Sequence, residues 1–297
     1  MLKQFIRTLS HKLFHQPPSA ALRTYRRKLE KKIYRTTFTE TDLLQKLRLM
    51  GLKPGITLFV HSSWNQFYNY HGNPLSLIQA LLKELGPNGT LAMPAFPLIA
   101  DAAEIFDVAM TPSGAGLMTE LFRRMDGVKR SISLDHSVCA LGNHAEELVS
   151  EHHLGVTSWD EVSPYYKLHK LDALILSLGV GHHLETTTAL HCAESILRTE
   201  ILYFKNLFPE SITYKYRDAS GKEGTHTYLK RVGKIRPKKI ADLLDKSIMI
   251  DDQISNLKVS TVPARYLIDQ VIAMGRRGIT MYVTPKPDKK LFQRLPP

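Results

Sequence analysis

A histidine and a glutamate three residues apart are the residues of this sequence best suited to acid–base chemistry. His191 and Glu194 lie in the stretch TALHCAESIL, residues 188–197. In a helix, this spacing places both side chains on one face. A carboxylate beside an imidazole orients the ring and stabilises its protonated form, as a general base requires. The spacing therefore predicts a catalytic pair, although it also fits a histidine and a glutamate that merely share a helical face.

The segment before this helix supports the catalytic interpretation. Residues 173–178 have the apolar composition of a buried strand, and a Gly-Val-Gly turn follows at 179–181. Thr186, Thr187 and Thr188 then lead into the helix, whose first backbone N–H groups are free to bind an anion or a developing oxyanion. Open α/β folds keep their ligand sites at the carboxyl ends of strands. We therefore expect the pair to stand at the end of a sheet.

Three other chemistries fit this stretch less well. The sequence GVGHHL at 179–184 lacks the third glycine of a dinucleotide-binding loop. Cys192 follows His191 directly, and adjacent side chains diverge on a helix, so a Cys–His nucleophile is not expected. Five potential metal ligands also crowd here, but their spacing matches no zinc motif and we expect no metal. The five are His182, His183, Glu185, His191 and Glu194.

Two further polar clusters are candidates for a site. They are His61, Ser62 and Ser63 in the first, and Arg130, Ser131, His136 and Ser137 in the second. The first follows a short apolar run and would lie at a strand end, either as a structural helix cap or as part of a site. The second places a cation and hydroxyl groups in a predicted loop, which suits a phosphate group.

The elements that must position these residues alternate between strands and helices. Thr39, with Asp42 three residues later, predicts the start of a helix that ends before Gly51. A strand at 57–61, a helix at 74–85 and a strand at 90–93 form a βαβ unit, which implies a parallel sheet. The other expected elements are a strand at 137–141, helices at 114–124, 145–152, 235–245 and 264–274, a helix start at Ser163-Pro164, and a hairpin around Ser220-Gly221.

Composition limits the class of protein and its location. The chain has 297 residues, 43% of them hydrophobic, which suffices for a substantial core. Two cysteines are too few for a disulfide framework and indicate a reducing compartment. No apolar run is long enough to span a bilayer, and the N-terminus does not resemble a signal peptide. We expect the protein in the cytoplasm.

The net charge of +12 is concentrated at the N-terminus. Residues 1–36 hold ten Lys and Arg against one acid, and their apolar residues follow helical spacing up to Pro17-Pro18. We therefore divide the chain into a basic amphipathic extension at 1–36 and a main domain at 37–297. Such a helix suits the anionic inner face of a membrane, or equally docking on its own domain or on a partner subunit. No nucleic-acid motif accompanies it, and nucleic acid is not an expected partner.

Taken together, the motifs resemble the aminoglycoside 3-N-acetyltransferase family. No single motif carries the likeness, which rests on their number and order over about residues 38–275. They are GLKPGITLFVHSS at 51–63, GPNGTLAMP at 86–94, RS at 130–131, HSVCALG at 136–142, SPYYKL at 163–168, LGVG at 178–181 and TALHCAE at 188–194. The resemblance implies a single three-layer α/β/α domain with a central mixed, largely parallel sheet.

The resemblance also implies a reaction, namely direct transfer of an acetyl group from acetyl-coenzyme A to an amine, without a metal. His191 would be the general base, Glu194 its partner, and Thr188 a group that positions the thioester or its oxyanion. The coenzyme A side of the site would include Ser62, Ser63, Arg130, Ser131 and Ser137. The acceptor side would include His61, Glu185 and Thr187, the last two standing where the family often has Asp-x-Asn.

Three functions follow as expectations. The first is an N-acetyltransferase acting on an amino sugar in surface polysaccharide biosynthesis, because the basic extension would hold it near the membrane. The second is an aminoglycoside 3-N-acetyltransferase that confers antibiotic resistance. The third is a non-catalytic coenzyme A-binding protein, because Ser133-Leu134 replace the family's usual His-Pro. The acceptor and the oligomeric state stay open.

Overall fold

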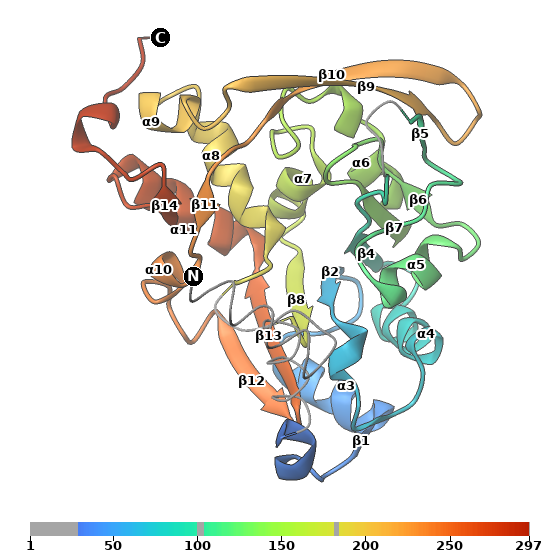
Figure 1. Cartoon of the computed structure of the whole chain (residues 1–297). Coiled ribbons are helices and arrows are strands. Elements are labelled where there is room, and N and C mark those ends of the chain that lie inside the picture. Colours follow the sequence, from blue (N-terminus) through green and yellow to red (C-terminus); the bar gives the residue numbers. More distant parts are fainter. Residues whose placement is uncertain (1–28, 100–103, 181–183, 297) are drawn as a thin grey trace, which may run out of the picture.

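We describe the protein from a computed structural model, which covers residues 29–99, 104–180 and 184–296 (Figure 1). The basic helix expected within residues 1–36 therefore lies almost wholly outside the described residues. Within the described ranges, no helix is both long enough and apolar enough to cross a membrane.

A seven-stranded sheet forms the centre of the molecule, in the order β12-β13-β8-β2-β4-β7-β6 (Figure 1). Its strands are β2 (Thr57–Ser62), β4 (Thr90–Pro94), β6 (Lys129–Arg130), β7 (Val138–Gly142), β8 (Leu174–Leu178), β12 (Ile250–Ile254) and β13 (Leu257–Pro263). Strands β8, β2 and β4 run parallel, as the expected βαβ unit requires. Their carboxyl ends therefore meet at one edge of the sheet.

The expectation of a largely parallel sheet is wrong, because only the β8–β2 and β2–β4 pairings are parallel. Strands β12 and β13 form a hairpin, which is antiparallel by construction, and β13 also runs antiparallel to β8. Strands β4, β7 and β6 continue in antiparallel pairings on the other side. The sheet is mixed. The 250–263 hairpin was not expected from the sequence, since its polar residues obscure the strand pattern.

Helices cover both faces of this sheet, giving three layers. In β2, Leu58 and Val60 point into one core, and Phe59 points into the other, as strand alternation requires. The first core packs against α3 (Glu40–Leu49), α4 (Pro74–Leu85) and α5 (Leu117–Arg123). The second packs against α6 (Ala145–Val149), α7 (Pro164–Lys170), α8 (His191–Leu197), α9 (Leu202–Lys205), α10 (Lys238–Ala241) and α11 (Ala264–Arg276).

Smaller sheets complete the domain. The predicted hairpin is confirmed as β9 (Glu210–Arg217) and β10 (Glu223–Lys230), and Figure 1 shows it running along the top of the molecule. Strand β5 (Phe106–Asp107) pairs with β9, and β1 (Phe38–Thr39) pairs with β3 (Tyr70–His71). Strand β11 (Lys234–Ile235) pairs with β14 (Tyr282–Thr284), which joins two distant parts of the C-terminal half.

Helix ends follow their capping residues. At α3, the side chains of Thr39 and Asp42 form the predicted reciprocal capping box, and Ser163 caps α7 as expected. The helix predicted at 235–245 is shortened to α10, because Pro237 disfavours helical backbone in the residue before it. Helix α5 begins only after Gly116, whose φ of +114° is outside the helical region.

Candidate active site

The predicted pair is formed at the start of α8. Nδ1 of His191 lies 3.0 Å from Oε2 and 3.2 Å from Oε1 of Glu194. Both residues are buried, with 8% of His191 and 2% of Glu194 exposed. Because a carboxylate oxygen accepts, Nδ1 carries the proton, which leaves Nε2 as the nitrogen able to accept one. The pair therefore has the tautomer that a general base needs.

The chain reaches this position through a tight turn after β8. Gly179 has a φ of +71°, and a side chain there would meet Cβ of Gln66 at 2.6 Å, so glycine is required on both counts. A short 3₁₀ turn (Thr188–Leu190) then leads into α8, whose Cys192, Ala193 and Leu197 lie in the core. The apolar face of α8 thus anchors the helix and holds the His191–Glu194 pair in place.

Two residues that the sequence did not single out complete the surroundings of Glu194. The hydroxyl of Tyr282, on β14, donates a hydrogen bond of 2.8 Å to Oε2 of Glu194. Nη1 of Arg231, just after β10, donates one of 2.8 Å to the Tyr282 hydroxyl, and Nε of Arg231 lies 3.8 Å from Oε2 of Glu194. Burial, and next the neighbouring Glu194, raises the pKa of Tyr282 well above its usual range, so its hydroxyl stays protonated.

Aromatic rings pack around the imidazole of His191. The Trp159 ring packs edge-on against His191 at 5.0 Å between centroids, and the His136 ring lies 4.4 Å from the Trp159 ring. Burial, with a further contribution from nearby His191, lowers the pKa of His136 well below its usual range, so His136 is neutral. Trp159 carried no signal in the sequence, because its role depends on contacts across elements.

His61 lies on the same side of the sheet, at the end of β2. Its ring packs against Phe59 at 5.0 Å, and Phe59 packs against Tyr165 at 5.7 Å. His61 is buried, and its Nε2 has no hydrogen-bond partner among the described residues. Burial lowers the pKa of His61 to about 4, which keeps the ring uncharged. Next along the chain, Ser62 is half-buried, and Ser63 donates its backbone N–H to the carbonyl of Leu178.

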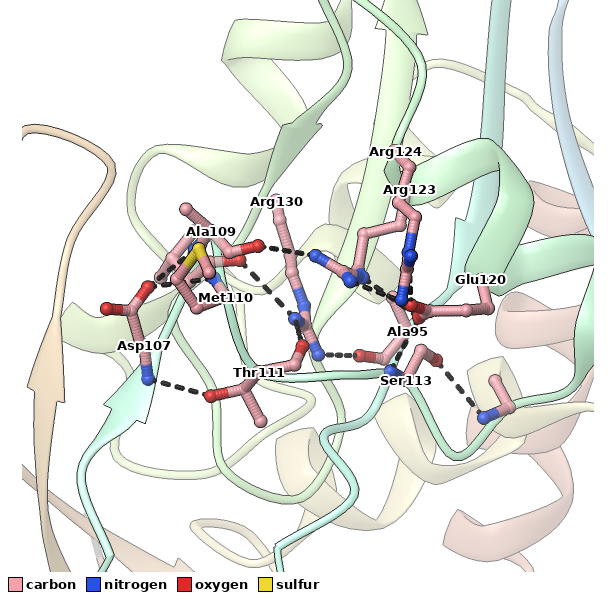
Figure 2. Close-up of polar contacts among 12 residues, drawn as sticks. Ala95, Asp107, Ala109, Met110, Thr111, Ser113, Glu120, Arg123, Arg124 and Arg130 are labelled. Carbon is pink, nitrogen blue, oxygen red and sulfur yellow. Dashed lines mark hydrogen bonds and ion pairs between the residues drawn. The ribbon is translucent and has the colours of Figure 1, made fainter.

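In the predicted phosphate loop, the side chains of Arg130, Ser131 and Ser137 are buried and hydrogen-bonded within the chain, whereas Nδ1 of His136 has no hydrogen-bond partner among the described residues. Arg130 donates to the carbonyls of Ala95 at 2.6 Å and Thr111 at 2.5 Å, as Figure 2 shows. It also donates to the hydroxyl of Ser137, which in turn donates to Ala95. The hydroxyl of Ser131 accepts from the backbone N–H of Val138. These contacts tie the loop after β4 to strands β6 and β7.

The other proposed site residues surround the entry to α8. Glu185 is exposed, Thr187 is buried and Thr188 is half-buried beside the hydroxyl of Tyr165. His182 and His183 lie outside the described residues. Within the described ranges, no group of three or more His, Cys, Asp or Glu side chains is arranged to hold a metal ion.

The sequence of this chain matches a known protein family and individual members of it. The family model described as aminoglycoside 3-N-acetyltransferase matches residues 59–275. Aminoglycoside N(3)-acetyltransferase IV of Salmonella sp is 38% identical over 157 residues, which cover 52% of this chain and 58% of that protein. The prophage-derived aminoglycoside N(3')-acetyltransferase-like protein YokD of Bacillus subtilis is 29% identical over 190 residues, covering 56% of this chain and 69% of that protein.

Solved structures agree with the sequence comparison. The structure of an aminoglycoside acetyltransferase AAC(3)-IVa mutant in complex with a gentamicin superposes with a TM-score of 0.68 at 28% identity, covering 81% of this chain and 89% of that one. The AAC-IIIb structure with CoASH has the same fold, with a TM-score of 0.67 at 23% identity, covering 85% of this chain and all of that one. The chain therefore belongs to the aminoglycoside 3-N-acetyltransferase family.

Proposed function

We propose that this protein transfers the acetyl group of acetyl-coenzyme A to an amine of an aminoglycoside-type amino sugar. The observation that carries the proposal is the buried His191–Glu194 pair, with Nδ1 turned to the carboxylate. A base held in one tautomer is what direct transfer to an amine requires, because the attacking nitrogen must lose a proton. Membership of the family supports the same reaction.

The proposed acyl transfer begins with attack of the acceptor amine on the thioester. The acceptor nitrogen bonds to the thioester carbonyl carbon, and Nε2 of His191 takes the proton that this nitrogen gives up. The carbon–sulfur bond then breaks, and the departing sulfur takes this proton from Nε2 of His191 and leaves as the thiol, which returns the imidazole to its neutral form. Glu194 stabilises the imidazolium that exists between these events. The Thr188 hydroxyl is proposed to donate a hydrogen bond to the carbonyl oxygen while it carries negative charge.

The remaining residues are assigned to the two substrates. Ser62, Ser63, Arg130, Ser131 and Ser137 are proposed for the coenzyme A side. Hydrogen bonds to backbone groups of the chain occupy the side chains of Arg130, Ser131 and Ser137. We therefore infer that these residues act indirectly, by fixing the backbone that lines the coenzyme A side. Glu185, Thr187 and His61 are proposed for the acceptor side. The exposed carboxylate of Glu185 suits a cationic amino sugar.

We place the antibiotic acceptor ahead of the surface-polysaccharide acceptor expected from the sequence. The relatives compared above are named for aminoglycosides, and one fold neighbour at 28% identity was solved with a gentamicin. The match to the Salmonella relative spans 58% of that protein's length, so its activity is carried to this chain as a proposal.

The test is thiol release from acetyl-coenzyme A in the presence of aminoglycosides, amino sugars and nucleotide-linked amino sugars. We expect turnover with an aminoglycoside, and a loss of about 10²- to 10⁴-fold in His191→Ala, the usual contribution of a general base. The exposed His71→Ala serves as the matched control, with unchanged turnover. Release with nucleotide-linked sugars alone would move the proposal to biosynthesis. Binding of coenzyme A without release across the panel would favour the non-catalytic alternative.

The basic extension at residues 1–36 is proposed to act separately from this site, at an anionic membrane surface. Sedimentation with vesicles containing phosphatidylserine tests this. Full-length protein is expected to bind them and to release at high salt, because the attraction is electrostatic. Equal binding by a chain lacking residues 1–36 would refute this role.

A further inference from the structure

We propose that Arg231 is a positioning residue that balances the charge of Glu194, so that His191 enters the reaction uncharged, with Tyr282 as the bridge between them. This inference rests on the proposed acyl transfer for its kinetic consequence. It has a spectroscopic consequence that needs no substrate.

The fold brings Arg231 and Tyr282 together through the pairing of β11 with β14, in which Ile235 lies opposite Tyr282. Between Arg231 and β11 stands Gly233, with a φ of +114°. A Cβ atom at Gly233 would lie 2.6 Å from the carbonyl oxygen of Thr284 and 2.7 Å from the Tyr282 ring. Glycine is therefore needed for the chain to pass this close to Tyr282 and to deliver the guanidinium to the site.

The contacts form a connected path that ends at the imidazole. Arg231 donates to the Tyr282 hydroxyl at 2.8 Å, and that hydroxyl donates to Glu194 at 2.8 Å. The guanidinium also lies over the Trp159 ring at 5.7 Å and over the Tyr282 ring at 5.8 Å. Nε of Arg231 is buried and has no hydrogen-bond partner among the described residues, which leaves it facing the Glu194 carboxylate at 3.8 Å. The position of Arg231 is thus fixed by its contacts with Tyr282, Trp159 and Glu194.

Charge neutrality gives this arrangement its effect. A carboxylate that is 2% exposed needs one compensating cation, because isolated buried charge is costly. With Arg231 in place, the Arg231–Glu194 pair is neutral and His191 can remain uncharged. Without Arg231, the lone carboxylate would favour a proton on His191 and would occupy the base before any substrate arrives. The titratable and charged groups around the pair are Arg231, Tyr282, His136, Cys192 and Tyr203.

The direct test follows the His191 imidazole by NMR over a pH series, with the signal assigned by its loss in His191→Ala. In Arg231→Gln we expect the pH of half-protonation to rise by about 1 unit, the lower end of the effect of a nearby opposite charge. Arg231→Met, apolar and of similar length, is expected to give the same rise and covers the case in which the glutamine variant does not fold. Arg231→Lys keeps the charge and should stay near wild type. Lys230→Gln removes an exposed neighbouring charge and is the matched control. An unchanged midpoint in the folded glutamine or methionine variant would overturn the proposal.

The kinetic test uses the pH–rate profile with an active acceptor. In Arg231→Gln the acidic limb should move to higher pH by the same amount, so that turnover falls by up to about tenfold at pH values below both midpoints and recovers at pH values above both. KM for acetyl-coenzyme A should stay the same. Tyr282→Phe should lower turnover by about tenfold, the value of one hydrogen bond to a charged group, whereas Tyr266→Phe on α11 should not. A pH-independent loss in Arg231→Gln would reduce Arg231 to a structural residue. An NMR shift in a protein that acetylates nothing would sustain this inference while refuting the proposed function.

Discussion

The hydroxyl of Ser131 and Nδ1 of His152 lie 2.9 Å apart inside the protein, where both residues are fully buried. Nε2 of His152 lies 3.1 Å from the carbonyl oxygen of Ser158, so Nε2 carries the proton and Nδ1 accepts from Ser131. The same hydroxyl accepts from the N–H of Val138. Ser131 therefore connects the edge of the central sheet to the loop that carries Trp159.

Ser131→Ala should destabilise the protein. It leaves the Val138 N–H and Nδ1 of His152 without partners in the interior, at a cost of about 2–3 kcal/mol in the free energy of unfolding. Urea denaturation followed by circular dichroism measures this. Ser211→Ala, exposed on β9, is the matched control and should change stability by less than about 0.5 kcal/mol. A rise in KM for acetyl-coenzyme A with unchanged stability would instead support a direct ligand contact for Ser131.

Stability should fall as pH is lowered from 6.5, before the carboxylates titrate. Burial lowers the folded-state pKa of His152 to about 3 and that of His61 to about 4, whereas the unfolded histidines titrate near 6.5. The unfolded state therefore binds more protons between these limits, and each histidine should remove about 1 kcal/mol between pH 6 and pH 5. Urea melts at the two pH values measure the slope. His152→Gln should reduce the loss of unfolding free energy between pH 6 and pH 5 by about 1 kcal/mol, the contribution of one histidine. Substitution of an exposed histidine, His71→Gln, should leave this loss unchanged. An identical slope in His152→Gln would show that His152 does not titrate as described.

Arg130→Met should cost about 3 kcal/mol in the free energy of unfolding, since it leaves the carbonyl of Thr111 without its donor and removes one of the two donors to the carbonyl of Ala95 (Figure 2). Burial lowers the pKa of Arg130 to about 10, so its charge persists at neutral pH. Lys129→Met is the neighbouring control. Lys129 is exposed and paired with Glu146, and such a surface pair is worth at most about 1 kcal/mol. Equal thermal stability in the two variants would contradict the structural role of Arg130.

Glu194→Gln should lower turnover by about 10²- to 10⁴-fold, the range seen when the group that orients a catalytic histidine loses its charge. An amide can keep the contact with Nδ1 of His191, but it cannot stabilise the imidazolium. Steady-state kinetics with acetyl-coenzyme A and an active acceptor measures the effect. The exposed Glu147→Gln on α6 should retain full activity. Retention of activity in Glu194→Gln would remove Glu194 from the proposed mechanism.

Local sequence patterns predict the structure correctly where residues close together in the chain determine it. The cap formed by Thr39 and Asp42, the start of α7 at Ser163, and the 3-residue spacing of His191 and Glu194 all involve groups within one helical turn. The buried strand before the turn at Gly179 was equally evident, because its apolar run is uninterrupted. Sequence alone therefore determined that a histidine and a carboxylate meet after a strand, and its ordered motifs determined the family.

Tertiary structure decided which residues hold that pair. Tyr282 is 88 positions from Glu194, and it arrives on a strand whose partner is set by the β11–β14 pairing. Arg231 lies beside the pair because Gly233 allows the chain to pass close to Tyr282. Trp159 contacts His191 from a loop. The mixed sheet was likewise decided by the 250–263 hairpin. Contacts across such distances depend on strand pairing and packing, which leave no periodic trace in the sequence. Only the folded chain therefore shows that the His191–Glu194 pair is surrounded by Arg231, Tyr282 and Trp159.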